Sequence, residues 1–320
     1  MKKIRTAVIG TGYLGKFHAE KYAELDNSEL IAVVDINKDN AEAVAKKTNT
    51  TALNSYESLL TKVDAVSIVT PTETHAKIGL DFLSRGIDVL IEKPMALSTA
   101  EADTLIKAAE ENNAILQIGH LERFNGAVLA LKDTPLDPVF IESHRLSPFP
   151  NRSTDVDVVL DLMIHDIDII LNLARAEVEK IDAVGIPVIS GKVDIANARL
   201  EFKNGCVANV TASRVSKEPQ RKMRIFQNET YISVDFATQQ ISIAKLEGAK
   251  DGEKPRIINE ELQIERQDSL LEEIKSFLNC SATREAPLVS GSDGKRALAV
   301  AAEIQEAVEE SIQKRKQNIK

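Results

Sequence analysis

The chain has 320 residues and a formal net charge of −9, with 43% hydrophobic and 28% charged residues. This length exceeds the size at which one hydrophobic core usually keeps growing, so we expect two domains, and the ordinary composition argues against disorder and short-period repeats. The acidic balance without a dense basic stripe argues against a nucleic-acid partner, and no apolar run approaches the roughly 20 residues that a membrane-spanning helix needs.

Short β-branched runs alternate with helical patterns over the first part of the chain. This alternation is the signature of repeated βαβ units, which build a parallel sheet with helices on both faces. We therefore predict an α/β domain with a doubly wound parallel sheet over residues 1–121. Its expected strands are Ile4–Ile9, Leu30–Asp35, Ala65–Val69, Asp88–Ile91 and Ala114–Ile118.

A different pattern follows, in which one long helical stretch precedes several strands joined by tight turns. Asn204 and Gly205 separate two of these strands, and we expect a type I′ hairpin turn, which needs positive φ at both residues. We predict an α+β domain over residues 122–320 with an open, mostly antiparallel sheet, and the last helix could pack back on the first domain. The expected elements are Val156–Leu173, Ala198–Phe202, Cys206–Thr211, Arg224–Gln227, Tyr231–Phe236, Ile241–Leu246, Ile257–Ile264, Leu270–Leu278 and Lys295–Ile312.

A glycine-rich segment directly follows the first expected strand and opens the first expected helix. It consists of Gly10, Thr11, Gly12, Tyr13, Leu14 and Gly15. In such a GxGxxG segment the first glycine permits a tight turn, the second lets the backbone approach a pyrophosphate, and the third lets helix and strand pack closely. The pyrophosphate can then rest on the N–H groups at the positive end of the helix. This context predicts a Rossmann dinucleotide-binding site, although a turn that binds nothing, or binds another nucleotide, has the same glycines.

Asp35 ends the next expected strand, 20 residues after Gly15. A carboxylate there accepts hydrogen bonds from the adenosine ribose and would repel a 2′-phosphate, so we expect NAD rather than NADP. Lys38, close in sequence, leaves NADP open. The ends of later strands line the same crevice in this fold, and we expect further cofactor contacts from Thr70, Pro71, His75, Glu92, Lys93 and Pro94. A surface position at a helix start is the alternative for His75.

Several short motifs occur in one order along the chain. They are Gly10–Gly15, His18, Thr70-Pro71, His75, Glu92-Lys93-Pro94 and the segment from Asp161 to Asp166. On these motifs the chain resembles the Gfo/Idh/MocA family, which includes glucose-fructose oxidoreductase and inositol dehydrogenase, over essentially its whole length. The resemblance implies a Rossmann domain followed by an open-faced sheet domain for substrate binding and oligomerisation. It also implies a sugar or cyclitol held between that sheet and the nicotinamide ring.

The resemblance further implies which side chains act. Lys93 matches the lysine of the family's Glu-Lys-Pro motif, for which a cis Lys-Pro bond is expected, and Asp161 and His165 match its Asp-x-x-x-His motif. A spacing of four places the last two on one helical face. Our hypothesis is that His165 accepts the substrate's hydroxyl proton, Lys93 stabilises the alkoxide and Asp161 fixes the substrate or the imidazole. The alternatives are a salt-bridged lysine and a satisfied core histidine.

Other segments resemble one branch of the family. Gly119–Asn125, Arg152–Asp157 and Asp161–Asp168 look like the branch that includes UDP-N-acetylglucosamine 3-dehydrogenases, which oxidise the sugar C3 hydroxyl. A nucleotide-sugar substrate contains a diphosphate, which arginine side chains bind well. For any arginine of the second domain, the alternative is a solvated charge on the face of the sheet. The chain departs from many relatives at Val158-Val159-Leu160, where they carry glycines. The expected substrate-binding residues are Arg152, Arg214 and Arg221.

Arg123 is expected near the nicotinamide end of the cofactor, with hinge packing as the alternative. The acidic residues Asp161, Asp166 and Asp168 could instead bind a metal, but no third ligand with suitable spacing accompanies Asp161 and His165, so we expect no metal. An inositol or free-hexose dehydrogenase remains open as a second function. A non-catalytic NAD(H)-binding regulator remains a third, and it would not need the proton-transfer residues.

Two isolated cysteines, Cys206 and Cys280, show neither metal-ligand nor redox spacing. This usage fits a reducing compartment, so we expect a cytoplasmic protein. An exposed sheet face in the second domain would offer a surface for self-association. We therefore also expect a homo-oligomer, either a dimer or a tetramer.

Overall fold

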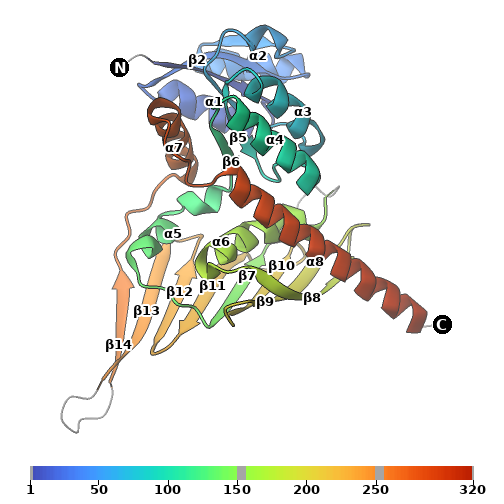
Figure 1. Cartoon of the computed structure of the whole chain (residues 1–320), viewed down its shortest axis with the longest axis vertical. Coiled ribbons are helices and arrows are strands. Elements are labelled where there is room, and N and C mark those ends of the chain that lie inside the picture. Colours follow the sequence, from blue (N-terminus) through green and yellow to red (C-terminus); the bar gives the residue numbers. More distant parts are fainter. Residues whose placement is uncertain (1–2, 150–155, 249–255, 319–320) are drawn as a thin grey trace. The chain divides into compact units, whose positions relative to one another are not determined.

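The computed structural model describes residues 3–149, 156–248 and 256–318. The chain forms two compact units (Figure 1): unit 1 comprises Met1–Phe124 and Asp268–Lys295, and unit 2 comprises Asn125–Gln267 and Arg296–Lys320. Residues 268–295 thus belong with the N-terminal part, which differs from a single boundary after residue 121. Among the described helices, none has the length and apolar character needed to cross a membrane.

A six-stranded parallel sheet forms the centre of unit 1. Its order, β3-β2-β1-β4-β5-β6, is that of a doubly wound dinucleotide-binding domain, and the predicted α/β class is confirmed. The order reverses between β1 and β4, so a ligand crevice is expected at the carboxyl ends of these two strands. The strands are β1 Ile4–Ile9, β2 Ser28–Val34, β3 Thr51–Leu53, β4 Ala65–Ile68, β5 Asp88–Glu92 and β6 Leu116–Gly119.

Helices cover both faces of this sheet (Figure 1). Helices α1, α2 and α7 share one apolar cluster with the sheet residue Leu90, whereas Gly79 of α3 lies against Ile91 and Leu105 of α4 on the other face. The helices are α1 Gly15–Glu24, α2 Lys38–Thr48, α3 Thr72–Leu83, α4 Thr99–Glu111 and α7 Ser269–Thr283, with short 3-10 helices η1 Glu57–Leu59 and η2 Leu121–Phe124.

Helix α7 completes the core of unit 1 from far along the sequence. Its residues Ile274, Phe277 and Leu278 are buried in the same cluster as Val8 and Leu90. This apolar burial explains why residues 268–295 join unit 1. Helix α8, Gly291–Asn318, starts in unit 1 but belongs to unit 2 from residue 296 onward.

Unit 2 contains an eight-stranded sheet in the order β14-β13-β12-β11-β7-β10-β9-β8. All neighbouring strands are antiparallel except β7 and β10, which confirms a mostly antiparallel sheet. The strands are β7 Phe140–Leu146, β8 Val178–Ile186, β9 Ile195–Phe202, β10 Val207–Ser213, β11 Gln220–Gln227, β12 Thr230–Asp235, β13 Gln240–Glu247 and β14 Arg256–Leu262.

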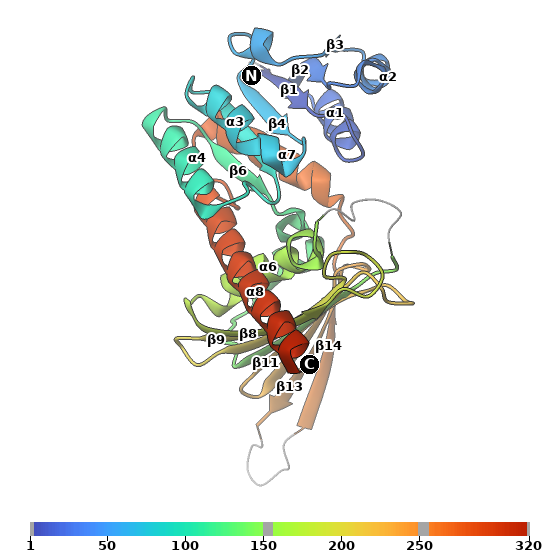
Figure 2. The same cartoon turned by 90° about the vertical axis from the view of Figure 1, so that its right-hand side faces the viewer.

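One face of this sheet packs against helices, and α6 and α8 lie on the same side of it (Figure 2). Inward-facing residues such as Ile141, Val210 and Ile225 form one core with Ile167 of α6 and Ile304 of α8. The other face carries polar residues such as Asn197, Arg199 and Thr211, together with a row of aromatic rings. The remaining helices of unit 2 are α5 Gly126–Ala130, η3 Leu131–Asp133, the π-helical turn η4 Val159–Met163 and α6 Ile164–Ala174.

The hairpin between β9 and β10 is not the expected type I′ turn. Gly205 has a φ of +86°, but Asn204 is not in the positive-φ region. The N–H of Gly205 donates to the carbonyl oxygen of Phe202 at 2.8 Å, so the turn runs over Lys203 and Asn204 and the left-handed glycine follows it. The prediction was wrong because a loop one residue longer, with glycine after the turn, also matches the right-handed twist of the strands.

Candidate functional site

The glycine loop of unit 1 has backbone conformations that side chains would prevent. Gly10 has a φ of +93°, and a Cβ atom there would lie 2.4 Å from the carbonyl oxygen of Val69. A Cβ on Gly15 would lie 1.9 Å from the carbonyl oxygen of Gly10, whereas a Cβ on Gly12 would meet no described atom within 4 Å. No side chain caps the start of α1 at Leu14. The loop therefore leaves open space beside the N–H groups of a helix N-terminus, which suits a phosphate.

A cavity of about 540 Å³ opens beside this loop. Its volume is within the roughly 300–1,000 Å³ range of small-molecule sites, and its lining is largely apolar. Five of the residues predicted to bind the cofactor are part of its wall. The lining comprises Ile9, Gly10, Gly12, Val34, Asp35, Ile36, Asn54, Ser55, Tyr56, Glu57, Val69, Thr70, Pro71, Glu73, Thr74, Lys77 and Ile78.

Asp35 is held in place at the end of β2 by neighbouring hydrogen bonds. Its Oδ2 accepts from the backbone N–H of Thr11 at 2.8 Å and from the Thr11 hydroxyl at 3.0 Å, while Oδ1 accepts from the N–H of Asn37 at 2.8 Å. Lys38 pairs with Glu42 on the exposed face of α2, with its Nζ 3.4 Å from Oε1. The cavity therefore presents a fixed negative charge where a ribose is expected.

His75 joins two loops rather than lining the cavity. Its Nε2 lies 2.8 Å from the carbonyl oxygen of Thr70, and its Nδ1 lies 2.9 Å from that of Pro94. The side chain is 1% exposed, so the alternative of a surface position is wrong. Burial lowers the pKa of His75, although both carbonyl oxygens oppose this shift. His75 thus connects the segments that follow β4 and β5.

The Glu92-Lys93-Pro94 segment ends β5, and the Lys93–Pro94 peptide bond is cis. The Oε1 of Glu92 lies 3.1 Å from Nε2 of His18, and its Oε2 accepts from the backbone N–H of Lys93 at 3.3 Å. Burial raises the pKa of Glu92, but the hydrogen bond from His18 and the nearby positive charges outweigh burial and lower it. An ionised Glu92 therefore fixes the backbone at Lys93.

In unit 2, Asp161 and His165 lie where the π-helical turn η4 leads into α6, and both side chains are half-buried. The carboxylate of Asp157 caps this end by accepting from two N–H groups of η4 at 2.9 and 3.1 Å. Such π turns are frequent at functional sites. The structure thus places Asp161 and His165 on one short stretch of helix, with Asp161 in the π turn and His165 in the first turn of α6, and the shared helical face stays a prediction.

A buried ion pair ties this helix to the sheet. Arg145 of β7 donates to the carboxylate of Asp166 through Nε at 2.8 Å and Nη2 at 3.0 Å. Both side chains are at most 4% exposed, and the Arg145 guanidinium lies 5.5 Å from the ring centre of Phe236. Since Asp166 follows His165 directly, this bidentate pair orients the start of α6. Asp166 is thereby engaged in an ion pair and is unsuited to the alternative metal role.

The predicted arginines have different surroundings. Arg214 is fully buried and donates to Asp194 at 2.9 Å and to the carbonyl oxygen of Val156, so its partners are intramolecular. Arg221 is exposed on β11 and lies opposite Arg145 in the sheet register. Arg152 lies outside the described residues. Arg123 is buried in η2 of unit 1, where its Nη2 donates to the carbonyl oxygen of Leu288 at 3.3 Å.

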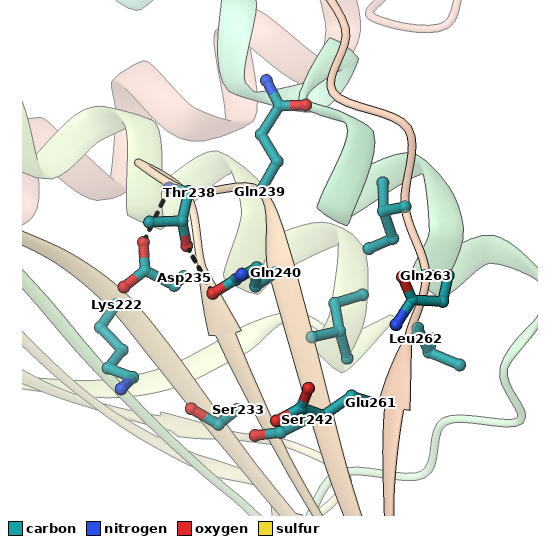
Figure 3. Close-up of a pocket in the computed structure, with 12 residues that line it drawn as sticks. Lys222, Ser233, Asp235, Thr238, Gln239, Gln240, Ser242, Glu261, Leu262 and Gln263 are labelled. Carbon is teal, nitrogen blue, oxygen red and sulfur yellow. Dashed lines mark hydrogen bonds between the residues drawn. The ribbon is translucent and has the colours of Figure 1, made fainter.

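A second cavity, of about 300 Å³, lies at the ends of β12, β13 and β14 in unit 2 (Figure 3). Lys222, Ser233 and Glu261 line it, and the carboxylate of Asp235 accepts from the N–H groups of the adjoining turn at 3.0 Å. None of the residues predicted from the sequence borders this cavity. Its mixture of one cation with two acids gives it no strong preference for an anion.

Glu273, to which the sequence analysis assigns no role, is buried beside His18 and Glu92. A signal was available in the sequence: Glu273 lies three residues after Leu270 and four before Phe277, on the apolar face of a predicted helix. An acid in that position either faces a partner or stays neutral.

Two family profiles match the chain. The profile described as the oxidoreductase family with an NAD-binding Rossmann fold matches residues 4–120, and the GFO/IDH/MocA C-terminal domain matches residues 136–233. These two ranges lie within the predicted first and second domains.

Several known proteins are similar over their full length. The UDP-N-acetylglucosamine 3-dehydrogenase of Acidithiobacillus ferrooxidans is 42% identical over 98% of this chain and 100% of its own, and its solved structure superposes with a TM-score of 0.92. The myo-inositol 2-dehydrogenase of Thermotoga maritima is 27% identical over 96% of this chain and 97% of its own. A levoglucosan dehydrogenase solved with NADH has the same fold, with a TM-score of 0.85 at 17% identity over 97% and 98% of the two chains.

Proposed function

Because the chain belongs to the Gfo/Idh/MocA oxidoreductase family, with an NAD-binding Rossmann domain, we propose that it oxidises the C3 hydroxyl of UDP-N-acetylglucosamine. The observation that carries this proposal is the 42% identity, over nearly all of both chains, to a dehydrogenase of that substrate. The myo-inositol 2-dehydrogenase is more distant at 27%, and it supports oxidation of a secondary alcohol rather than this particular substrate.

The cofactor proposal rests on the cavity of unit 1. Gly12 leaves open space at the N-terminus of α1, where a pyrophosphate would be held by backbone N–H groups. Asp35 would accept hydrogen bonds from the ribose hydroxyls and would repel a 2′-phosphate. Lys38 is paired with Glu42, which weakens any attraction between Lys38 and a 2′-phosphate. NAD is therefore the proposed cofactor, in preference to NADP.

Bound NAD supplies the hydride acceptor, and the chain has to remove the hydroxyl proton, because an alcohol is far too weak an acid near neutral pH. We assign proton removal to the imidazole of His165. Lys93 donates a hydrogen bond to the same substrate oxygen and stabilises its developing negative charge, and Asp161 orients the substrate or the imidazole. Glu92 holds the Lys93 backbone and the Arg145–Asp166 pair holds the helix of His165, so both groups are preorganised.

For the diphosphate we retain Arg152 and Arg221 as proposed contacts. Arg221 is exposed on the face of the sheet that also bears Arg145. Arg214 is left out because Asp194 already occupies its guanidinium.

Self-association through the helix-free face of the unit 2 sheet is also proposed. The rings of Phe140, Phe226 and Tyr231 form a row there, with centroids 5.6 and 5.1 Å apart and tilted ring planes. Such a face suits an isologous dimer or a tetramer. Cys206 and Cys280 are both free and buried, which supports our placement of the enzyme in the cytoplasm.

The test follows NADH formation with UDP-N-acetylglucosamine, myo-inositol and glucose as separate substrates, with an aminotransferase that consumes the ketone. We expect turnover with the nucleotide sugar, and turnover with inositol alone would contradict the substrate. Lys93→Met and His165→Ala should each lower kcat by about a hundredfold or more while leaving NADH binding unchanged. Lys107→Met, an exposed lysine on α4, is the control. Unchanged rates in both variants would remove these residues from the mechanism.

A further inference from the structure

Three ionisable side chains meet in the interior of unit 1. His18 comes from α1, Glu92 from β5 and Glu273 from α7, and one polar atom of each lies within 4.8 Å of the others. His18 and Glu273 are fully buried, and the Glu92 side chain is 12% exposed. The Nε2 of His18 lies 3.1 Å from Oε1 of Glu92, and because a carboxylate oxygen only accepts, Nε2 carries a proton and donates to it.

The buried group has too few hydrogen-bond donors. Both carboxyl oxygens of Glu273 lack a hydrogen-bond partner among the described residues. Gln117 on β6 donates its amide to the Glu273 carbonyl oxygen at 3.1 Å, and within the same described residues its own side-chain oxygen also lacks a donor. An ionised carboxylate without donors is costly in an interior, so either a proton or a cation has to be present.

Protonation of Glu273 removes the cost of burying a second carboxylate charge. Two adjacent carboxylates disfavour simultaneous ionisation, and one of them then keeps its proton. Burial raises the pKa of Glu273 well above its usual value, and the charge of Glu92 raises it further. The pKa of Glu92 is lowered instead, since the effects of His18 and Lys93 outweigh burial. Glu92 therefore ionises while Glu273 stays neutral.

We infer that Glu273 is a positioning residue, which keeps its proton and donates it to Glu92 through one buried water, so that the pair carries one negative charge beside Lys93. A separation of at most 4.8 Å is within the span of one water bonded to both carboxyl groups. Glu92 accepts from the N–H of Lys93, so the shared proton also fixes the carboxylate that holds this backbone. The consequence for Lys93 rests on the proposed function.

The other groups around Glu273 are compatible with this assignment. Tyr22 on α1 shares a 2.7 Å hydrogen bond with the hydroxyl of Ser67, and burial raises its pKa, so the phenol stays neutral. Gln117 carries no charge. Glu92 is thus the neighbour whose negative charge raises the pKa of Glu273.

The first test compares unfolding of the wild type and Glu273→Gln in urea between about pH 5 and pH 8. A raised folded-state pKa means that the native protein holds a proton that the unfolded chain releases above about pH 4.3, so this contribution to stability is lost as pH rises. Glutamine mimics the protonated acid and does not titrate. We expect the stability of Glu273→Gln relative to the wild type to increase with pH.

The matched control is Glu272→Gln, a partly exposed neighbour paired with Lys275 on the same helix, which should show no such trend. A stability difference for Glu273→Gln that is constant or falls with pH would overturn the inference. So would one equivalent of divalent metal in the purified wild type that is lost from Glu273→Gln, because a cation would then occupy the position of the proton.

The second test concerns positioning. Glu273→Gln should retain kcat for the proposed reaction within about threefold, whereas Glu273→Leu, which cannot donate, should lower kcat about tenfold with an unchanged KM for NAD. Equal kcat values for the two variants would overturn the positioning role. A wild type without turnover would refute the proposed function alone, since the unfolding test needs no reaction.

Discussion

Unit 1 shapes its proposed cofactor cavity with backbone, whereas unit 2 holds its candidate catalytic helix with buried ion pairs. In unit 1 the decisive features are Gly10 and Gly15, where a Cβ would overlap carbonyl oxygens. In unit 2 the Arg145–Asp166 and Arg214–Asp194 pairs join residues 21 and 20 positions apart. The two units should therefore be sensitive to different substitutions. Added atoms in the glycine loop should disrupt unit 1, and removal of a buried charge should destabilise unit 2.

The largest effect is expected from Gly15→Ala. The added Cβ would lie 1.9 Å from a backbone oxygen that cannot move away without opening the loop, so NADH affinity should fall about a hundredfold or more and stability should fall as well. Gly12→Ala is the matched variant, because its Cβ meets open space in the ligand-free protein. It should keep the wild-type melting temperature yet lose NADH affinity, as measured by calorimetric titration. Normal NADH binding by both variants would refute a backbone-built phosphate site.

An intermediate effect is expected from Arg145→Ala. Removing one partner leaves the buried charge of Asp166 without its guanidinium, which should cost about 3–5 kcal/mol in the free energy of unfolding. The double variant Arg145→Met/Asp166→Leu should recover most of this stability, because a buried pair can be replaced by apolar residues of similar size. Urea denaturation measures both. A small loss in the single variant would mean that the pair does not anchor α6.

The smallest effect is expected from Asp35→Asn. The amide oxygen can still accept from Thr11, but the negative charge is gone, so the preference for NAD over NADP should fall about tenfold, or 1.4 kcal/mol. The ratio of the two dissociation constants measures it, with Asp39→Asn in the first turn of α2 as the control. A wild type that already prefers NADP would contradict the role given to Asp35.

The contrast between local backbone features and long-range ion pairs also explains which features the sequence predicts well. The glycine loop, the position of Asp35 directly after β2 and the alternation of strands and helices are local patterns, and the sheet of unit 1 agrees with them. The spacing of Asp161 and His165 is likewise local, and both lie on one stretch of helix.

Features that depend on distant partners were not predictable in this way. Strand β7 was missed because its alternating positions include Ser143 and Arg145, buried polar residues that make sense only beside α6. Arg214 likewise depends on a distant partner: its sequence context suggested a ligand contact, but the structure pairs it with Asp194. Glu273 is an acidic residue on an apolar helix face, and its burial is understood only once Glu92 and His18 are known to lie beside it.

The return of α7 to unit 1 has a consequence during translation. All six strands of the first sheet are synthesised by residue 119, but α7, which packs in one cluster with Val8 and Leu90, is synthesised only after every strand of the second sheet. Until then the apolar sheet residues that α7 covers stay without this partner, and transiently exposed apolar surface of this kind makes a folding chain prone to aggregation. A product that stops at residue 267 would leave these residues uncovered and would be prone to aggregation or proteolysis.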